Sequence, residues 1–265
     1  MLPISSLSQK ALADIQFILS DFDDTLTFNG GLLSTTLKAL EELNAVGVKV
    51  IPVTGGCAGW SDMMARTLPV SGVISEGGSI FIEKKTNGRT QYHFCVPEHE
   101  IRAFQKATLE TVQRALGEGS TLKLASDQEF RISDVAIDFA QDVVPPAHKE
   151  KTQLLDRLKR SGLNAKVSSI HINITHPEAD KWRMSKRVLT DFYCLAESDF
   201  SNDVLAVGDA PNDQALFERF SKSVGVANIV RYEKELITPP RYVTQFEGGH
   251  GFAELSKLII AAKST

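Results

Sequence analysis

Short apolar runs and helical stripes alternate along the first 75 residues. Three runs read as buried strands, at residues 16–19, 48–53 and 71–75. Between the first two, an apolar stripe with three-residue spacing predicts a helix, at Leu37, Leu40, Leu43 and Val46. Ser34 is a candidate N-cap of this helix, Gly47 ends it, and residues 59–69 predict a second helix. This order of strands and helices is typical of a parallel sheet with right-handed crossovers.

The pattern changes between residues 84 and 175. Strand-like segments occur here at 90–96, 120–125, 134–140 and 166–175. Helical segments occur at 98–116 and after Pro145 and Pro146. This mixture indicates an α+β module with an antiparallel sheet. Beyond it the first pattern returns, with strands at 203–208 and 223–227 and helices at 183–193, 211–220 and 251–263.

The simplest domain organisation is an α/β domain that is interrupted by a second domain. We expect the α/β domain to comprise residues 1–84 and 176–265, and the inserted α+β domain residues 85–175. At 265 residues the chain is long enough for two modest domains of this kind.

Composition narrows the class of protein. The chain is 42% hydrophobic and 23% charged, with a formal net charge of -4, which argues against a dedicated binder of nucleic acid or anionic membranes. Cys57, Cys95 and Cys194 lie far apart and lack metal-ligand spacing, so we expect reduced thiols. No apolar run approaches the roughly 20 residues of a membrane span. We therefore expect a soluble, cytoplasmic monomer or homodimer that binds neither nucleic acid nor membrane.

Candidate chemistry lies directly after three of the predicted strands. The polar clusters there are Asp21 and Asp23, Thr54 with Gly55 and Gly56, and Asp209 with Asn212 and Asp213. In an open parallel sheet, ligands bind at the carboxyl ends of the strands. The three clusters are therefore expected to meet at one edge and to form a site.

The residue types at this edge suit phosphoryl transfer. Grouped carboxylates favour Mg²⁺, which prefers a few carboxylates together with water and phosphate oxygens. Thr54 and the glycine amides after it can donate hydrogen bonds to a phosphoryl group. Asp21 is then placed to attack phosphorus, and Asp23 to protonate the leaving oxygen and to deprotonate water.

Several motifs resemble those of the haloacid dehalogenase (HAD) superfamily, in order along the chain. "DFDDTLT" resembles its nucleophile motif, "VTGG" its threonine motif and "GDAPND" its metal motif. "VISEGGSI" resembles a stretch found in subfamily IIB, the Cof-type and sucrose-phosphatase-like members. "ADKWRMSKRVL" stands where the family has its lysine motif, which makes Lys181 the lysine. The resemblance implies a Rossmann-like core with an inserted α+β type-II cap.

The resemblance also implies roles for single residues. Asp21 would be the nucleophile, Asp23 the general acid and base, and Lys181 the cation that neutralises both nucleophile and phosphate. The phosphate group would be held by Thr54, Gly55, Lys181 and Asn212. Mg²⁺ would be held by Asp21, by Asp209, by the backbone carbonyl of Asp23 and, in support, by Asp213.

Three positions depart from the family pattern. Gly56 replaces an arginine that many relatives carry, so a substrate contact made there must be absent or come from elsewhere. Trp182 replaces the glycine that usually follows the lysine, and Gly77 stands where asparagine is frequent. None of the three changes removes a member of the catalytic set.

Substrate contacts from the inserted domain are harder to assign. Ile170, Ile172 and Ile174 alternate with polar residues, so one face of this strand packs and the other is polar. The polar face comprises Ser169, His171, Asn173 and Thr175, and it faces either the substrate or water. Arg131 and Asp138 are further candidates for substrate contacts.

The sequence thus predicts a Mg²⁺-dependent phosphatase. It would hydrolyse a small phosphorylated metabolite, with sugar phosphates first, through an aspartyl-phosphate on Asp21. A phosphomutase would use the same nucleophile, but the compact "GDAPND" does not resemble the longer metal motif of phosphomannomutases. A catalytically silent phosphosugar-binding module is the other alternative, although both Asp21 and Asp23 are present.

Overall fold

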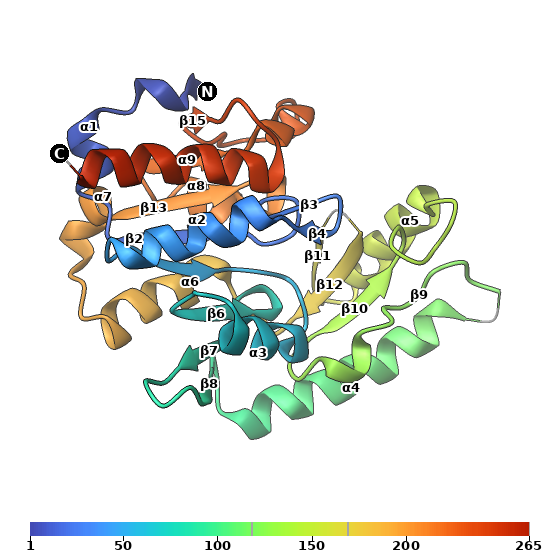
Figure 1. Ribbon diagram of the computed structural model, residues 1–265. Coiled ribbons are helices and arrows are strands. Elements are labelled where there is room, and N and C mark those ends of the chain that lie inside the picture. The colour runs from blue at the N-terminus through green and yellow to red at the C-terminus, as the bar shows by residue number, and fades with distance from the viewer. Residues whose placement is uncertain (118, 169, 265) are drawn as a thin grey trace.

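A parallel sheet of six strands forms the centre of the larger domain (Figure 1). The computed structural model describes residues 1–117, 119–168 and 170–264. The strand order is β1-β15-β14-β13-β2-β5, and every neighbouring pair is parallel. The strands are β1 (Leu2–Pro3), β2 (Phe17–Ser20), β5 (Lys49–Pro52), β13 (Val204–Gly208), β14 (Lys222–Gly225) and β15 (Tyr242–Val243).

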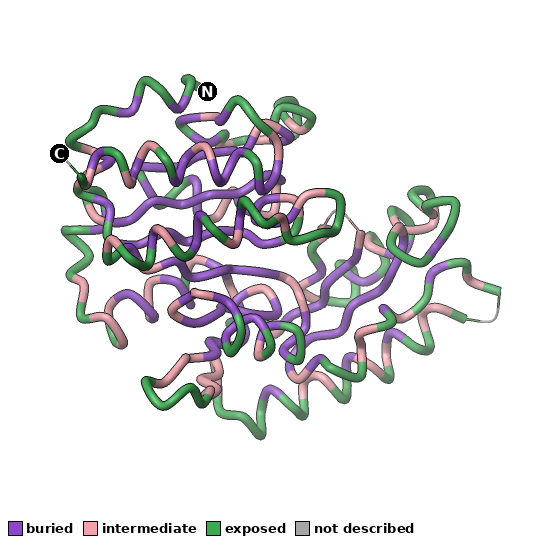
Figure 2. The backbone as a smooth tube through the Cα atoms, in the orientation of Figure 1, coloured by how far each residue is buried: buried purple, intermediate pink, exposed green. Residues whose placement is uncertain are grey.

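The register of the central strands brings their carboxyl ends to one level. Ser20, the last residue of β2, pairs with Pro52 of β5 and with Val207 of β13. The chain therefore leaves all three strands at the same edge of the sheet. Their short apolar sequences form strands because both faces of the sheet are covered, as is usual for parallel sheets. Figure 2 shows β2 and β13 buried along their length, and β5 buried except at its first residue.

Helices cover the two faces of the sheet and give three layers. Ile18 and Val50 belong to one apolar cluster with residues of α2 and α9, and Leu19 and Ile51 to another with residues of α6. Adjacent residues thus point to opposite layers, as strand geometry requires. The helices of this domain are α1 (Gln9–Ala13), α2 (Ser34–Ala45), α3 (Ala58–Thr67), α6 (Lys181–Arg187), α7 (Phe200–Asp203), α8 (Gln214–Phe217) and α9 (Gly248–Lys263).

A second, antiparallel sheet extends this domain and corrects the predicted domain boundary. It consists of β6 (Gly72–Ser75), β7 (Ile80–Lys84) and β8 (Thr90–Phe94), and a bridge from Val53 to Ile74 joins it to the end of β5. We expected β8 in the inserted domain, but it pairs with β7 along its whole length. The inserted domain therefore begins between β8 and α4 (Glu98–Leu116), not at residue 85.

The inserted domain, called the cap below, is an antiparallel sheet packed against two helices. Its strands, in the order β11-β12-β10-β9, are β9 (Lys123–Leu124), β10 (Val135–Asp138), β11 (Asn164–Val167) and β12 (His171–Thr175). Val112 of α4 and Leu154 of α5 (His148–Arg160) pack against Ile137 and Ile172 of this sheet. The α+β architecture predicted for this region is thereby confirmed.

Local details differ from the sequence-based expectations in three places. The single strand expected at 166–175 is divided between β11 and β12, which pair with each other. Hydrogen bonds from Ser168 N to His171 O (2.8 Å) and from His171 N to Ser168 Oγ (3.0 Å) close the connection. Ser34 is the first residue of α2, and Leu33 holds the N-cap position. A short hairpin of β3 (Thr27–Phe28) and β4 (Gly31–Leu32) follows Asp21 and was not predicted. None of the described helices is long and apolar enough to cross a membrane.

Candidate active site

Three acidic residues predicted from strand ends meet in the structure. Asp21 directly follows β2, Asp209 directly follows β13, and Asp213 lies in the turn after it. One carboxylate oxygen of each lies within 4.8 Å of the other two, and all three residues are buried. The convergence that the sequence predicts at this sheet edge is present.

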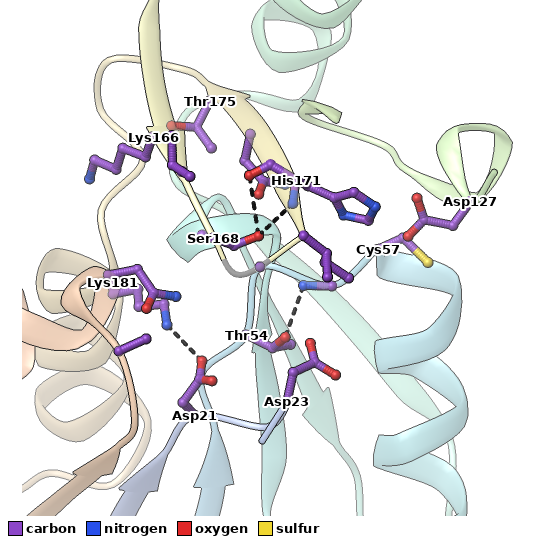
Figure 3. A pocket seen from close by; sticks show the side chains of 18 of the residues that line it. Asp21, Asp23, Thr54, Cys57, Asp127, Lys166, Ser168, His171, Thr175 and Lys181 are labelled. Atoms are coloured by element: carbon purple, nitrogen blue, oxygen red, sulfur yellow. Dashed lines mark hydrogen bonds and ion pairs between the residues drawn. The ribbon is translucent and has the colours of Figure 1, made fainter. Parts of the chain in front are cut away.

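Lys181 is the cation of this cluster. Its Nζ lies 2.8 Å from Asp21 Oδ1 (Figure 3). The same Nζ lies 2.7 Å from Asp213 Oδ1. Lys181 is the first residue of α6, and the Asp180 side chain caps that helix by accepting a hydrogen bond from Trp182 N. The Trp182 ring packs edge-on against Phe200 and Phe220. The tryptophan that replaces the usual glycine therefore anchors the lysine helix in the core.

Backbone contacts fix Asp213. Its Oδ2 accepts hydrogen bonds from Asp209 N (3.1 Å) and Ala210 N (3.4 Å), while Oδ1 faces Lys181. A Cβ at position 208 would overlap the Asp213 carboxylate, so glycine is the residue that fits before Asp209. In "GDAPND" the chain thus forms a turn in which the carboxylate of Asp213 accepts hydrogen bonds from the backbone amides of Asp209 and Ala210.

The cluster holds more negative than positive charge. Burial, then the charge of Asp213, raises the pKa of Asp21 to about 8, although Lys181 lowers it. Burial, then Asp21, raises the pKa of Asp209 to about 9. Burial alone would lower the pKa of Lys181, but the two carboxylates outweigh it and raise that pKa. Three carboxylates against one ammonium form a site in which a further cation is strongly favoured.

The donor set fits Mg²⁺. It groups carboxylate oxygens of three residues within 4.8 Å of one another, and two of these residues, Asp21 and Asp209, line a cavity that has room for water and phosphate oxygens. Asn228 supports the set, because its Nδ2 donates to Asp209 Oδ2 (2.9 Å) and to Asp24 O (3.0 Å). Thr25 Oγ1 lies 3.4 Å from the other Asp209 oxygen. Residues around the cluster therefore fix the direction of its carboxylates.

The loop after β5 lies beside the acidic cluster. Thr54 is buried, and its Oγ1 accepts a hydrogen bond from Gly56 N (2.9 Å). Its backbone is held by bonds from Thr54 N to Ile74 O (2.8 Å) and from Gly77 N to Thr54 O (3.0 Å). A Cβ at Gly56 would come within 3.2 Å of Thr54 Oγ1, which is tight. The glycine that replaces the family's arginine thus leaves room for the threonine hydroxyl.

Asp23 points into the same cavity from the other side of Asp21 (Figure 3). The residue is exposed, yet the protein around its carboxylate raises its pKa, first by desolvation and then by the charge of Asp24. A raised pKa favours a carboxyl group that carries a proton and can give it up. Asn212 also lines the cavity, and its buried Oδ1 has no hydrogen-bond partner in the described part of the chain.

The cap forms the opposite wall of this cavity. The cavity holds about 180 Å³, over ten times the roughly 10–15 Å³ that one water needs, so it has room for a small organic molecule. His171, Asn173 and Thr175 line it, which settles the question that the sequence left open: this polar face looks into the cavity. Ser169, part of the same predicted face, lies outside the described residues.

His171 is the cap residue with the clearest unused polar atom. It is 6% exposed, and its Nε2 has no hydrogen-bond partner among the described residues. Burial, then the charge of Arg131, lowers the pKa of His171, so its imidazole is neutral near pH 7.

Arg131 and Asp138, the other cap candidates, are held by the protein itself. Arg131 forms ion pairs with Asp127 (2.9 Å) and Asp134 (3.0 Å), and it donates to Gly55 O (3.1 Å) across the domain boundary. It lines the cavity with its charge already paired. The Asp138 carboxylate accepts hydrogen bonds from backbone amides at 140, 141 and 142, and Asp138 is not among the described residues that line the cavity.

Sequence reasoning missed three residues near the site: Glu76, Asp127 and Asn228. Asn228 follows β14 at the same sheet edge as Asp21, so the rule that found the aspartates also applies to it. Glu76 directly follows β6 and carried the same signal. Asp127 lies in a loop of the cap with no distinguishing pattern.

Comparisons with known proteins agree with this architecture. No family model matches the chain. A phosphoglycolate phosphatase from Methanobrevibacter smithii is 23% identical over 224 residues, which cover 84% of this chain and 90% of that protein. A HAD/COF-like hydrolase from Plasmodium vivax has a TM-score of 0.67 at 18% identity, and the match covers 96% of this chain and 99% of that one.

A second solved structure relates the fold to a named substrate. The sucrose-phosphatase from Synechocystis sp., solved with sucrose and phosphate, has a TM-score of 0.63 at 17% identity, over 92% of this chain and 98% of that one. Almost the whole of each chain matches, so the likeness includes both core and cap. The chain therefore has the fold of the HAD hydrolases with an inserted cap, as its motifs predicted.

Proposed function

We propose that this protein is a Mg²⁺-dependent phosphatase that hydrolyses a small phosphorylated metabolite. The observation that carries the proposal is the ion-pair network in which Lys181 joins Asp21 to Asp213, with Asp209 beside them, at the bottom of an organic-sized cavity. Three buried carboxylates beside one ammonium leave excess negative charge, which is costly in a buried site. A site that receives a cation and a phosphoryl group uses this arrangement.

Asp21 is the proposed nucleophile. One of its carboxylate oxygens is held by Lys181, and its carboxylate lies at the floor of the cavity. The carboxylate forms an oxygen–phosphorus bond as the bond from phosphorus to the leaving oxygen breaks, which gives an aspartyl-phosphate and an alcohol. Asp23 donates the proton that the leaving oxygen needs, consistent with its raised pKa.

Hydrolysis of the acyl-phosphate completes the cycle. Asp23, now ionised, takes a proton from water, the water oxygen bonds to phosphorus, and Asp21 leaves as a carboxylate. Lys181 and the Thr54 loop hold the phosphoryl oxygens throughout. Asp21, Asp209 and Asp213 would hold Mg²⁺, whose positive charge would favour ionised Asp21 and offset the charge of the phosphoryl group.

Sugar phosphates are the proposed substrate class. The side chains that the cap presents to the cavity are mostly uncharged hydrogen-bonding groups, at Ser126, Gln141, Ser168, His171, Asn173 and Thr175. Such groups suit the hydroxyls of a sugar. The sucrose-phosphatase likeness points to the same class.

Phosphoglycolate is a second candidate substrate, favoured by the relative from M. smithii. Its carboxylate requires a cation, and Lys166 on the cavity rim is only loosely paired, at 3.6 Å from Asp180. Lys166 therefore marks where a carboxylate-bearing leaving group would bind.

A phosphoester panel tests the proposal directly. Phosphate release is measured with and without Mg²⁺ for hexose phosphates, disaccharide phosphates and phosphoglycolate. We expect Mg²⁺-dependent turnover with the highest kcat/KM for a sugar phosphate. Best turnover of phosphoglycolate would move the substrate class to small carboxylates, and no turnover of any ester with Mg²⁺ would reject the phosphatase.

A further inference from the structure

Glu76 is a fully buried carboxylate at the boundary between core and cap. It directly follows β6 and has a left-handed backbone, with φ +48, which side chains other than glycine rarely adopt. Backbone bonds hold it there: Glu76 N donates to Gly56 O (3.2 Å), and Gly77 N donates to Thr54 O (3.0 Å). A strained position kept by such contacts marks a residue with a specific task.

The carboxylate of Glu76 accepts hydrogen bonds from both domains. On the core side, Oε1 accepts from Ala58 N (2.8 Å), the first residue of α3. On the cap side, Oε1 accepts from Ile132 N (3.0 Å), and Oε2 accepts from Ser133 N (2.7 Å), Ser133 Oγ and Asp134 N (3.1 Å). Three successive cap amides thus converge on one carboxylate, an arrangement that binds anions strongly.

The residues beside these amides reach the cavity. Arg131 precedes them and donates to Gly55 O (3.1 Å) in the Thr54 loop. Asp134, the last of the three, pairs with Arg131 and accepts a hydrogen bond from Asn173 Nδ2 (3.3 Å). Arg131 and Asn173 line the cavity. The hydrogen bonds between Glu76 and the cap therefore fix how the cap wall lies against the loop of residues 54–56, called the Thr54 loop.

We infer that Glu76 is a positioning residue that fixes the cap over the phosphate-binding loop and thereby sets the fit of the leaving group. The Thr54 loop itself does not depend on the Glu76 side chain, because backbone groups of residues 74–77 also hold it. The Glu76 side chain fixes the position of the cap, and the cap contacts the leaving group of the substrate. The kinetic part of this inference rests on the proposed phosphatase function.

Glu76→Gln tests the inference with an almost isosteric change. The amide nitrogen replaces one carboxylate oxygen and faces N–H donors, so it removes bonds on that side while the shape is kept. Glu254→Gln is the matched control: its Oε2 also accepts two backbone amides, Gln245 N (2.8 Å) and Phe246 N (3.3 Å), but within the core alone.

Hydrogen exchange followed by NMR reads the contact without any need for activity. In Glu76→Gln the amides of residues 132–134 should exchange at least about tenfold faster than in wild type, while the β10–β12 ladder keeps its protection. In Glu254→Gln these amides should exchange at the wild-type rate. Unchanged protection of residues 132–134 in Glu76→Gln would overturn the inference.

Kinetics separate positioning from general stabilisation. For the best sugar phosphate of the panel, Glu76→Gln should raise KM about tenfold, whereas the inhibition constant of inorganic phosphate stays within about twofold. An equal loss for both ligands, or for neither, would contradict a role in leaving-group fit. If wild type hydrolyses no phosphoester, the proposed function fails, and the exchange experiment still decides whether Glu76 holds the cap.

A second variant from the cap side covers the case in which Glu76→Gln does not fold. Ser133→Ala removes the hydroxyl that donates to Glu76 and keeps the three amides. We expect the amides of residues 132–134 to exchange about threefold faster than in wild type. We also expect KM to rise, as in Glu76→Gln. Wild-type exchange in Ser133→Ala would then count against the inference.

Discussion

The two walls of the cavity hold their charged groups in different ways. On the core wall, three carboxylates share one ammonium group, and the pKa values of Asp21 and Asp209 rise to about 8 and 9. On the cap wall, the guanidinium of Arg131 pairs with the carboxylates of Asp127 and Asp134. The backbone N–H of Asp134 in turn donates a hydrogen bond to the Glu76 carboxylate. The core carboxylates converge on one place that a cation can fill, whereas the cap-side carboxylates are held by Arg131 and, at Glu76, by backbone amides.

This difference separates chemistry from recognition. The excess negative charge of the core wall favours a cation, which would in turn hold the phosphoryl oxygens, and its carboxylates lie at strand ends that the sheet holds rigidly. Arg131, Asp127 and Asp134 pair with one another, so mostly neutral groups of the cap are left to contact the leaving group. Changes in the core wall should therefore affect turnover, and changes in the cap wall should affect substrate affinity.

Removal of the proposed nucleophile should have the largest effect. We expect Asp21→Asn to lower kcat by at least about 10⁴-fold, because no other group in the cluster is placed to bond with phosphorus. Steady-state phosphate release measures the loss, and mass spectrometry of acid-quenched wild type should find phosphate on Asp21.

Asp24→Asn is the control for this variant. Asp24 is a neighbouring carboxylate with left-handed backbone, at φ +53, which asparagine tolerates. Its kcat should remain within about threefold of wild type. Normal turnover in Asp21→Asn would reject the covalent mechanism.

Loss of the core ammonium should reduce both stability and turnover. Lys181→Met keeps the aliphatic stem but leaves Asp21 and Asp213 unpaired, so we expect a loss of about 3–5 kcal/mol in unfolding free energy. Urea denaturation measures it, and kcat/KM should fall by about 10²–10³-fold. Lys186 lies on the same helix and forms an exposed ion pair with Glu197 outside that helix, so it gives the control: Lys186→Met should cost less than about 1 kcal/mol. Equal losses of unfolding free energy in the two variants would show that the buried ion pairs of Lys181 stabilise the protein no more than an exposed pair does.

Cation binding should depend on pH in a direction fixed by the raised carboxylate pKa values. The folded state holds the protons of Asp21 and Asp209 more tightly than the unfolded chain does, so stability without a cation falls as pH rises from about 4 towards 8 and 9. Mg²⁺ must displace those protons at low pH but meets ionised carboxylates at high pH.

Thermal unfolding with and without Mg²⁺ checks this linkage. At about 100 times its Kd, Mg²⁺ should stabilise by about 2.7 kcal/mol, which corresponds to a rise in Tm of roughly 5–10 °C near pH 8.5. The rise should be clearly smaller near pH 5.5. Asp209→Asn should lose most of the rise at the higher pH. A Tm increase of the same size at both pH values would show that Mg²⁺ binds at a site other than this carboxylate cluster.

The core wall was predictable from sequence, because strand ends and polar clusters coincide there. Each apolar run was followed at once by polar residues, and parallel strands bring such ends together. Lys181 could be assigned only through the family resemblance, since a lysine at a helix start has no distinctive pattern.

The cap wall was less predictable, for a physical reason. The partners of Glu76 are backbone amides of residues 132–134, which leave no trace in the sequence. The alternation in β8 marks a strand but does not indicate which sheet it joins, so it was placed in the wrong domain. The alternation in β12 did predict a polar face, and only the arrangement of the two domains shows where that face points.

The smallest predicted effect concerns His171, where affinity and stability should change in opposite directions. Its Nε2 is buried without a partner among the described residues, so His171→Phe removes an unsatisfied polar atom and should leave Tm unchanged or higher. If the imidazole binds a leaving-group hydroxyl, the same change should raise KM for the best sugar phosphate about five- to tenfold, with kcat nearly unchanged. Arg131→Met is the contrasting variant on the same wall, because it leaves Asp127 and Asp134 unpaired and should lower Tm strongly. A lower Tm in His171→Phe without a change in KM would mean that this side chain contributes to packing of the cap and does not contact the substrate.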